Sequence, residues 1–160
     1  MSTSYSQDSP LSRVRVIADF QFGKGAGEAL FPGSCEFTLS RTGRIRQILD
    51  AGARIATIRA EDGRLTLGEE GATRLHSALP APAYRVIIQD DVIEFVRQGK
   101  NAFSRHVTGA DPGIRADDEV LVVSAGDELV ASGTAMLSGK EMLVFNYGVA
   151  VKVRHGRSQT

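Results

Sequence analysis

The chain has 160 residues with 19 basic and 19 acidic side chains, so its formal net charge at pH 7 is zero. This neutrality argues against a protein that coats nucleic acid through bulk positive charge, although it permits a local basic patch. Hydrophobic residues make up 42% and charged residues 24%, which are ordinary globular values and exclude general disorder. No apolar run is long enough to cross a membrane as a helix.

The single cysteine, Cys35, excludes an internal disulfide and a multi-cysteine zinc site, and it suits a reducing compartment. The polar, Ser-rich start of the chain, residues 1–10, lacks the apolar core of a secretory signal. We therefore expect a cytoplasmic protein with no membrane contact.

Pro80 and Pro82, with small residues around them, predict a stiff connector between two small domains, because proline disfavours helix and sheet interiors. We expect a polar, disordered tail over residues 1–12, a first domain over 13–79 and a second domain over 84–154.

In the first domain, the alternation of arginine and valine over residues 13–18 indicates either a strand or the start of a helix, with one wet face. The run Gly23–Gly27 predicts a flexible turn. A helix is expected over 69–79 from apolar residues at helical spacing, and Asp62-Gly63 predicts a tight hairpin turn. Alternating apolar residues predict strands over 35–40, 45–49, 54–59 and 65–67.

In the second domain, we expect a helix from Val92, capped by Asp90-Asp91 and ended by Gly99. Ser138 and Glu141 have the spacing of a capping box at the start of another short helix. An extended segment is expected over 101–107, with strands over 84–88, 119–123, 129–137 and 149–154. Many short strands with few short helices predict an α+β protein whose second domain is a small mixed barrel.

Four ordered stretches of the second domain form one pattern: Glu94–Phe103, Asp111–Val123, Leu129–Ala135 and Gly148–Arg154. Together they resemble a PUA domain, the RNA-binding module named after pseudouridine synthases and archaeosine transglycosylases. The resemblance covers about Tyr84 to Arg154. It implies a compact mixed β pseudo-barrel that binds RNA along its first helix, the following loop and a neighbouring strand.

The stretch Ala18–Pro32, with the unusual run Gln21-Phe22-Gly23-Lys24-Gly25, is similar to the small α/β domain before the PUA module in archaeal tRNA-guanine (archaeosine) transglycosylases. Those enzymes also need a catalytic barrel with an aspartate pair and a cysteine-rich zinc site. The chain has neither the length nor the cysteines for that barrel. The resemblance therefore implies an accessory chain that is not itself an enzyme.

Two stretches of the second domain are basic. Residues 97–115 carry four basic side chains against Asp111 alone, and residues 152–157 carry three against none. Basic side chains of this kind can bind phosphates, and the backbone N–H groups that follow a glycine can bind a further phosphate. An amide side chain or an aromatic ring can contact a base. A core position is the favoured interpretation for Phe103. With the resemblance, the RNA-binding candidates are Gly99, Lys100, Asn101, Phe103, Arg105, His106, Arg115, Lys152 and Arg154.

Two other features have simpler interpretations. The glycine run around Lys24 lacks the spacing of a P-loop or a dinucleotide fingerprint, so a structural loop is favoured over an RNA or partner contact. Arg41, Arg44 and Arg46 form a third basic cluster, for which a solvated face is favoured.

Signs of catalysis are poor. The histidines His76, His106 and His155 are dispersed, and Cys35 lies in an expected strand, where a buried thiol is more common than a nucleophile. We expect no catalytic residue, metal or cofactor. The leading hypothesis is a protein that binds tRNA or other structured RNA, alone or as an accessory to an RNA-modifying enzyme. The alternative is a non-catalytic protein-interaction subunit of a split tRNA-modifying enzyme, without RNA affinity of its own. The oligomeric state is left open.

Overall fold

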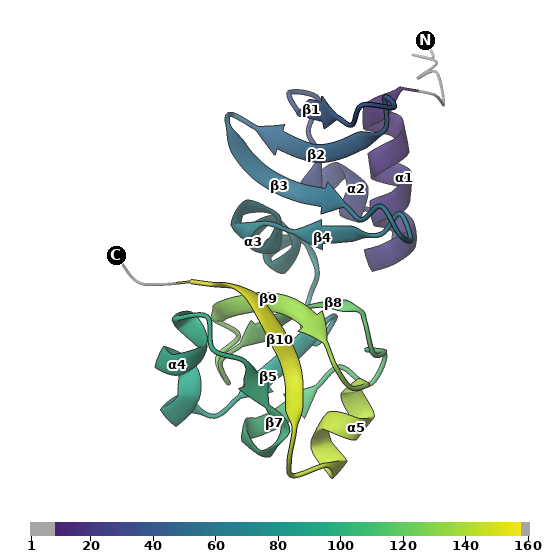
Figure 1. Ribbon diagram of the computed structural model, residues 1–160. Helices are drawn as coiled ribbons and strands as arrows, with labels where there is room; N and C mark the ends of the chain where they lie inside the picture. Colours follow the sequence, from purple (N-terminus) through teal and green to yellow (C-terminus); the bar gives the residue numbers. More distant parts are fainter. Residues whose placement is uncertain (1–8, 158–160) are drawn as a thin grey trace. The chain divides into compact units, whose positions relative to one another are not determined.

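The computed structural model describes residues 9–157, which divide into two compact units between Ala78 and Leu79 (Figure 1). The first unit is a four-stranded antiparallel sheet with helices, and the second is a six-stranded mixed sheet with short helices. The α+β class and the small mixed barrel are thus confirmed. No helix in residues 9–157 has the length and apolar character needed to span a bilayer.

The first element is a helix, α1 (Pro10–Phe22), which settles the choice between strand and helix over residues 13–18. Ser9 caps it, because its hydroxyl accepts the Ser12 N–H at 3.1 Å, and Pro10 occupies the first turn, where no N–H is needed. Val14, Ala18 and Phe22 are buried at a spacing of four, which gives the helix one inward face. The helix begins inside the expected tail, whose residues 1–8 lie outside the described part.

The glycine run is a tight turn followed by a second helix, α2 (Ala26–Leu30), rather than a flexible segment throughout. Gly23 and Gly25 have φ values of 115° and 97°, which other residues rarely adopt. Gly27 lies against α1: a Cβ at this position would stand 2.3 Å from the Arg15 carbonyl oxygen. The glycine therefore permits the close approach of the two helices.

The sheet of the first unit is a meander in the order β1-β2-β3-β4, with every pair antiparallel. Ile48, Ile55 and Leu67 are fully buried. Cys35 differs from its expectation: it precedes β1 in a turn closed by its N–H on the Pro32 carbonyl at 3.1 Å, and it is only partly buried. The elements are β1 (Glu36–Leu39), β2 (Ile45–Asp50), β3 (Ala53–Ile58), β4 (Leu65–Leu67) and α3 (Glu69–Ala78).

Among the described residues, the second unit has the strand order β6-β10-β9-β8-β5-β7, in which the β5–β8 pair is parallel and the other pairs are antiparallel. Its core includes Val86, Val122, Val130 and Val151, all 0% exposed. The strands are β5 (Arg85–Ile88), β6 (Ala102–Phe103), β7 (Val107–Ala110), β8 (Glu119–Val123), β9 (Leu129–Ala135) and β10 (Val149–Gly156).

The short helices of this unit match the sequence unevenly. Helix α5 (Gly139–Val144) starts with the expected capping box, in which Ser138 and Glu141 bond each other's backbone N–H groups at 3.1 and 2.9 Å. The expected Asp90-Asp91 cap is wrong: a 3-10 turn, η1 (Asp90–Val92), precedes α4 (Ile93–Arg97), and neither helix has a side-chain cap. The expected extended segment over 101–107 is interrupted by another 3-10 turn, η2 (Ser104–His106).

Candidate functional site

A hollow of about 410 Å³ lies on the second unit between α4 and the segment from Lys100 to His106. Five of the nine RNA-binding candidates line it. They are Lys100, Asn101, Phe103, Arg105 and His106, with Asp91, Val92, Phe95, Val96 and Ala102 completing the lining. The hollow therefore combines two cationic side chains, the carboxylate of Asp91, an imidazole, an amide and two phenyl rings.

The chain enters the hollow through a helix end at Gly99, whose φ is 97°. The Gly99 N–H bonds the Val96 carbonyl at 2.9 Å and the Lys100 N–H bonds the Phe95 carbonyl at 3.1 Å, which is the Schellman pattern. Both amides are thus used within the helix end. Of the Lys100 and Asn101 N–H groups expected to meet a phosphate, that of Lys100 is therefore already bonded to Phe95, and the Lys100 side chain is the donor that this residue can offer.

Asn101 fastens this segment to β10. Its Oδ1 accepts the backbone N–H of Val153 at 3.0 Å, while the neighbouring Ala102 and Phe103 pair with Val151 and Val149 as strand β6. The side-chain carbonyl is consequently engaged, and the NH₂ group is the part of Asn101 that can donate to a ligand.

Two exposed aromatic rings contribute to the apolar surface of the hollow. Phe103, for which a core position was the favoured interpretation, is 41% exposed, and Phe95 is 60% exposed. Sequence reasoning did not single out Phe95 as a site residue. The signal was available, because Ile93 and Val96 face the core and the helical period then places Phe95 toward solvent. Exposed rings of this kind are platforms on which unpaired bases stack.

The positive charge of residues 97–115 is smaller in the structure than along the sequence. Arg97 pairs with Glu94 at 2.7 Å and with Glu128 at 2.5 Å, so its charge is balanced. Lys100 and Arg105 are exposed and make no ion pair among residues 9–157. The hollow thus keeps two available cations, beside a half-buried His106 that adds charge when protonated.

The other candidates do not line the hollow. Arg115 is exposed in the turn between β7 and β8, and Lys152 is exposed on β10. Arg154 forms an ion pair with the buried Glu119 and donates to the Thr134 hydroxyl at 2.8 Å. Because its charge is balanced inside the sheet, Arg154 has a structural role that the sequence did not indicate.

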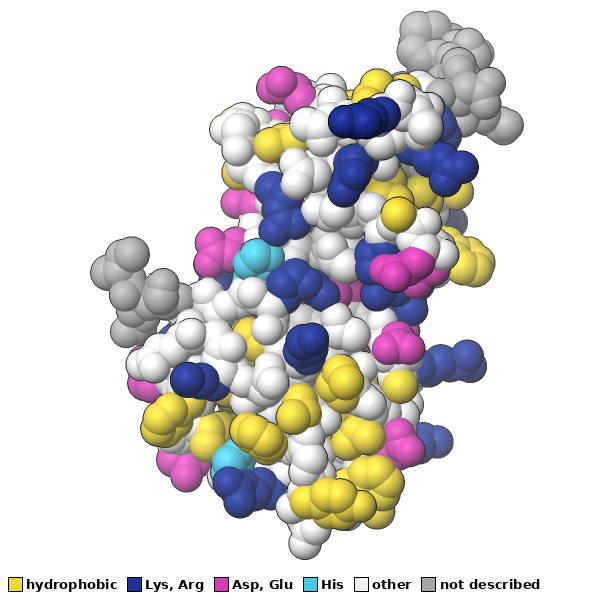
Figure 2. All heavy atoms as spheres, in the orientation of Figure 1, with side chains coloured by type: hydrophobic (Ala, Val, Ile, Leu, Met, Phe, Trp, Pro, Cys, Tyr) yellow, Lys and Arg dark blue, Asp and Glu magenta, His cyan; other side chains and the backbone are white. Residues whose placement is uncertain are grey.

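Figure 2 shows where these groups lie on the visible face. Hydrophobic side chains gather on the second unit over α4, β10 and α5, and Lys, Arg and His side chains stand among them. The hollow beside α4 occupies one part of this surface, and no residue of α5 lines it.

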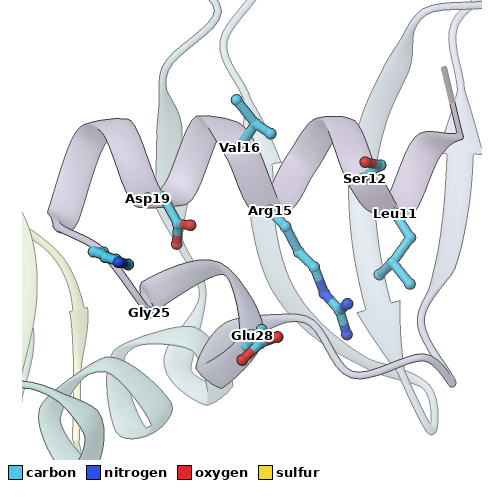
Figure 3. Close-up of a pocket in the computed structure, with 8 residues that line it drawn as sticks. Leu11, Ser12, Arg15, Val16, Asp19, Gly25 and Glu28 are labelled. Atoms are coloured by element: carbon cyan, nitrogen blue, oxygen red, sulfur yellow. The ribbon is translucent and has the colours of Figure 1, made fainter. Parts of the chain in front are cut away.

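The glycine-rich run of the first unit borders a separate hollow of about 320 Å³ between α1 and α2 (Figure 3). Asp19 on α1 points to the start of α2, where its Oδ1 accepts the Gly27 N–H at 2.7 Å. The backbone N–H of Gly27, which a nucleotide phosphate at this helix start would need, therefore already donates to a carboxylate. The structural interpretation of this run is favoured.

Neither a candidate metal site nor an activated thiol is found among the described residues. Within residues 9–157, no three His, Cys, Asp or Glu side chains gather as a metal ion would require. Partial burial, with the charge of Asp50 nearby, raises the pKa of the Cys35 thiol. This keeps the thiol protonated and makes it a poor nucleophile.

Comparison with known proteins divides the chain in two. Residues 12–82 match the family described as patch-forming domain C2 of tRNA-guanine transglycosylase, and residues 84–157 match the PUA domain family. Among curated relatives, the tRNA-guanine(15) transglycosylase of Pyrococcus abyssi is 52% identical over 96% of this chain, and that of Methanothermobacter thermautotrophicus is 49% identical over 91%. The chain spans only 26% and 22% of the length of these two relatives.

Solved structures share the fold across most of the chain. A hypothetical protein from Pyrococcus horikoshii superposes with a TM-score of 0.72 over 93% of this chain and 90% of its own, at 21% identity. A conserved PUA domain protein from Thermoplasma acidophilum gives a TM-score of 0.59 over 91% of both chains, at 16% identity. At these identities the likeness concerns the fold alone.

Proposed function

The chain belongs to the proteins in which patch-forming domain C2 of tRNA-guanine transglycosylase precedes a PUA domain, and we propose that it binds structured RNA, tRNA foremost. Its relatives of about 50% identity are named for a tRNA-modifying activity, which supports a role as a stand-alone or accessory factor in RNA modification. The two matched domains are not catalytic ones, so we propose that the chain itself is not an enzyme.

One observation carries this proposal: in the hollow beside α4, two exposed rings lie next to two cations that form no ion pair within residues 9–157. Phe95 and Phe103 offer faces to bases, while Lys100 and Arg105 offer charge to phosphates. The Asn101 NH₂ adds a donor whose position is fixed by the bond to Val153. Exposed Lys152, two positions before the paired Arg154, extends the basic surface along β10.

Charge reversal tests the proposal directly. Affinity for a labelled tRNA transcript is measured by fluorescence anisotropy over a range of salt concentrations. We expect the full chain to bind, and Lys100→Glu/Arg105→Glu to weaken binding at least tenfold at low salt. The salt slope is the slope of the logarithm of the binding constant against the logarithm of the salt concentration. Each lost phosphate contact lowers its magnitude by about 0.9, so the double variant should lose about 2 units of slope.

The matched control reverses a charge away from the hollow. Lys140→Glu changes an exposed residue of α5, outside the candidate surface, and should leave affinity within about twofold through weak long-range electrostatics only. Equal effects of Lys140→Glu and Lys100→Glu would show a non-specific attraction. An intact chain without tRNA affinity would overturn the proposal.

A protein-interaction role is the second candidate, because part of the second unit exposes a cluster of large apolar residues. Val144 is 77% exposed and Tyr147 73% exposed, and the Tyr147 ring stacks on Phe145 at a centroid distance of 6.0 Å. Exposed apolar patches of this kind commonly mark protein contacts. Stoichiometric co-purification with a modifying enzyme, lost in Val144→Ser/Tyr147→Ser and insensitive to nuclease, would favour this role.

A further inference from the structure

The first unit contains a larger groove, of about 720 Å³, at one end of its sheet. The turns that join β1 to β2 and β3 to β4 lie at this same end, because the four strands form a meander. Arg13 and Ile17 of α1 form the remaining side. The groove therefore collects residues from three segments that are far apart in the sequence.

Arginines dominate the rim of this groove. Arg13 on α1, Arg44 before β2 and Arg46 on β2 are all exposed, and none makes an ion pair among residues 9–157. Asp62, the one carboxylate among the described residues of the lining, is engaged by Arg59, whose Nε donates to Asp62 Oδ1 at 3.1 Å. The rim thus has an excess of positive charge with guanidinium groups available for a ligand.

The rest of the groove lining is largely apolar, and hydrogen bonds fix the turn between β1 and β2 that carries Arg44. Ile17, Ile45 and Ile58 contribute the apolar lining. The Ser40 hydroxyl accepts the Arg44 N–H at 3.1 Å, and the Ser40 N–H bonds the Arg44 carbonyl at 2.7 Å. These bonds fix the backbone at Arg44, so the arginine is presented from an ordered turn and the side chain itself remains available.

We propose that this groove is a second RNA-binding site, which holds the sugar–phosphate backbone of the same class of RNA that the second unit binds. The inference rests on the proposed function. Each guanidinium group can donate two parallel hydrogen bonds to the oxygens of one phosphate, and the apolar lining accommodates sugar rings. None of the described residues that line the groove is aromatic, so it holds the backbone without reading bases. Of the cluster Arg41, Arg44 and Arg46, for which the sequence favours a solvated face, Arg44 and Arg46 are part of this site and Arg41 is not.

The test uses the full chain and a labelled tRNA transcript, with anisotropy measured over a salt series. Arg44→Glu/Arg46→Glu should weaken binding about tenfold at low salt and lower the salt slope by about 2 units. Both side chains are exposed, so thermal unfolding should be unchanged. Lys140→Glu is again the control. With 4-thiouridine in the tRNA, cross-links should appear in the peptides containing residues 40–46 and be lost in the double variant.

The outcomes separate the two sites. Unchanged affinity and slope in Arg44→Glu/Arg46→Glu, with a loss in Lys100→Glu/Arg105→Glu, would overturn the groove and leave the proposed function standing. The reverse pattern would support the groove and reject the hollow beside α4. If Arg44→Glu/Arg46→Glu kept tRNA affinity but lost binding of a polyglutamate peptide, the groove would be a site for acidic protein segments, and the proposal that it binds RNA would be wrong.

Discussion

The side chain of Asn101 accepts a hydrogen bond of 3.0 Å from the backbone N–H of Val153, 52 positions along the chain. This bond joins the loop after α4 to β10 and sets the position of Lys100 and Phe103 on either side. The arrangement of the hollow therefore depends on a contact that neither segment can make alone.

Asn101→Ala leaves the partly buried Val153 N–H without its acceptor. We expect a loss of about 1–2 kcal/mol in unfolding free energy, measured by urea denaturation, together with weaker tRNA binding. Asn101→Asp separates the two effects, because it keeps an acceptor for Val153 and replaces the outward NH₂ with a negative oxygen. Stability should then be largely retained while tRNA affinity falls. Equal tRNA affinity for Asn101→Asp and the native chain would remove Asn101 from the site.

Phe95→Ala and Phe103→Ala remove the two exposed rings of the hollow. Each should weaken binding of a single-stranded oligonucleotide by about 1–3 kcal/mol if a base stacks on it, as measured by anisotropy. Since the rings are 60% and 41% exposed, the melting temperature should change little. Tyr147→Ala, at 73% exposure and outside the lining, is the aromatic control. Loss of stability with unchanged affinity would assign the rings to packing.

Lys152 and Arg154 lie two positions apart on β10 but differ in their surroundings, so their substitutions should differ in kind. Arg154→Ala leaves the buried carboxylate of Glu119 without this cation, and we expect a destabilisation of about 3 kcal/mol. Lys152→Ala should change unfolding free energy by less than about 0.5 kcal/mol, because the side chain is exposed, and should weaken tRNA binding instead. A stable Arg154→Ala chain would contradict the structural role of this pair.

Gly27→Ala tests the close approach of α1 and α2. The new methyl group would stand 2.3 Å from the Arg15 carbonyl oxygen, a backbone atom that cannot move aside without shifting a helix. We expect a loss of at least about 2 kcal/mol, seen as a lower melting temperature of the chain. Gly33→Ala is the matched control, since nothing lies within 4 Å of its added Cβ and its φ is not in the left-handed region. Equal melting temperatures for both variants would refute the packing argument.

Much of the fold could be predicted because its signals are local. The Ser138–Glu141 capping box spans three residues, and the strands around Ile48 and Val122 follow from short apolar patterns that recur in the structure. The arginine–valine alternation of α1 was ambiguous, since its inward residues, Val14 and Ala18, fit both periods over so short a stretch. The capping Ser9 and Pro10 decide for the helix.

The candidate site was predicted only in part. The five candidates from Lys100 to His106 lie together around the hollow, and they are also close in sequence. The sequence predicts that Arg154 binds phosphates, because its ion-pair partner, Glu119, lies 35 positions away and is not visible from the neighbouring residues. Whether a basic residue is balanced by an acid depends on the register of β8, β9 and β10, and a residue's neighbours in sequence do not set that register.

The sequence by itself determined the class of the protein: a neutral chain of 160 residues, two small domains, most of the strands, and three separate basic clusters. Only the tertiary structure decided which of those charges are available. It balances Arg97 and Arg154 with carboxylates, and it brings Arg13 to Arg44 and Arg46 around one groove. The physical reason is that a net charge of zero is a sum, whereas binding depends on the charges that folding leaves unpaired at one place on the surface.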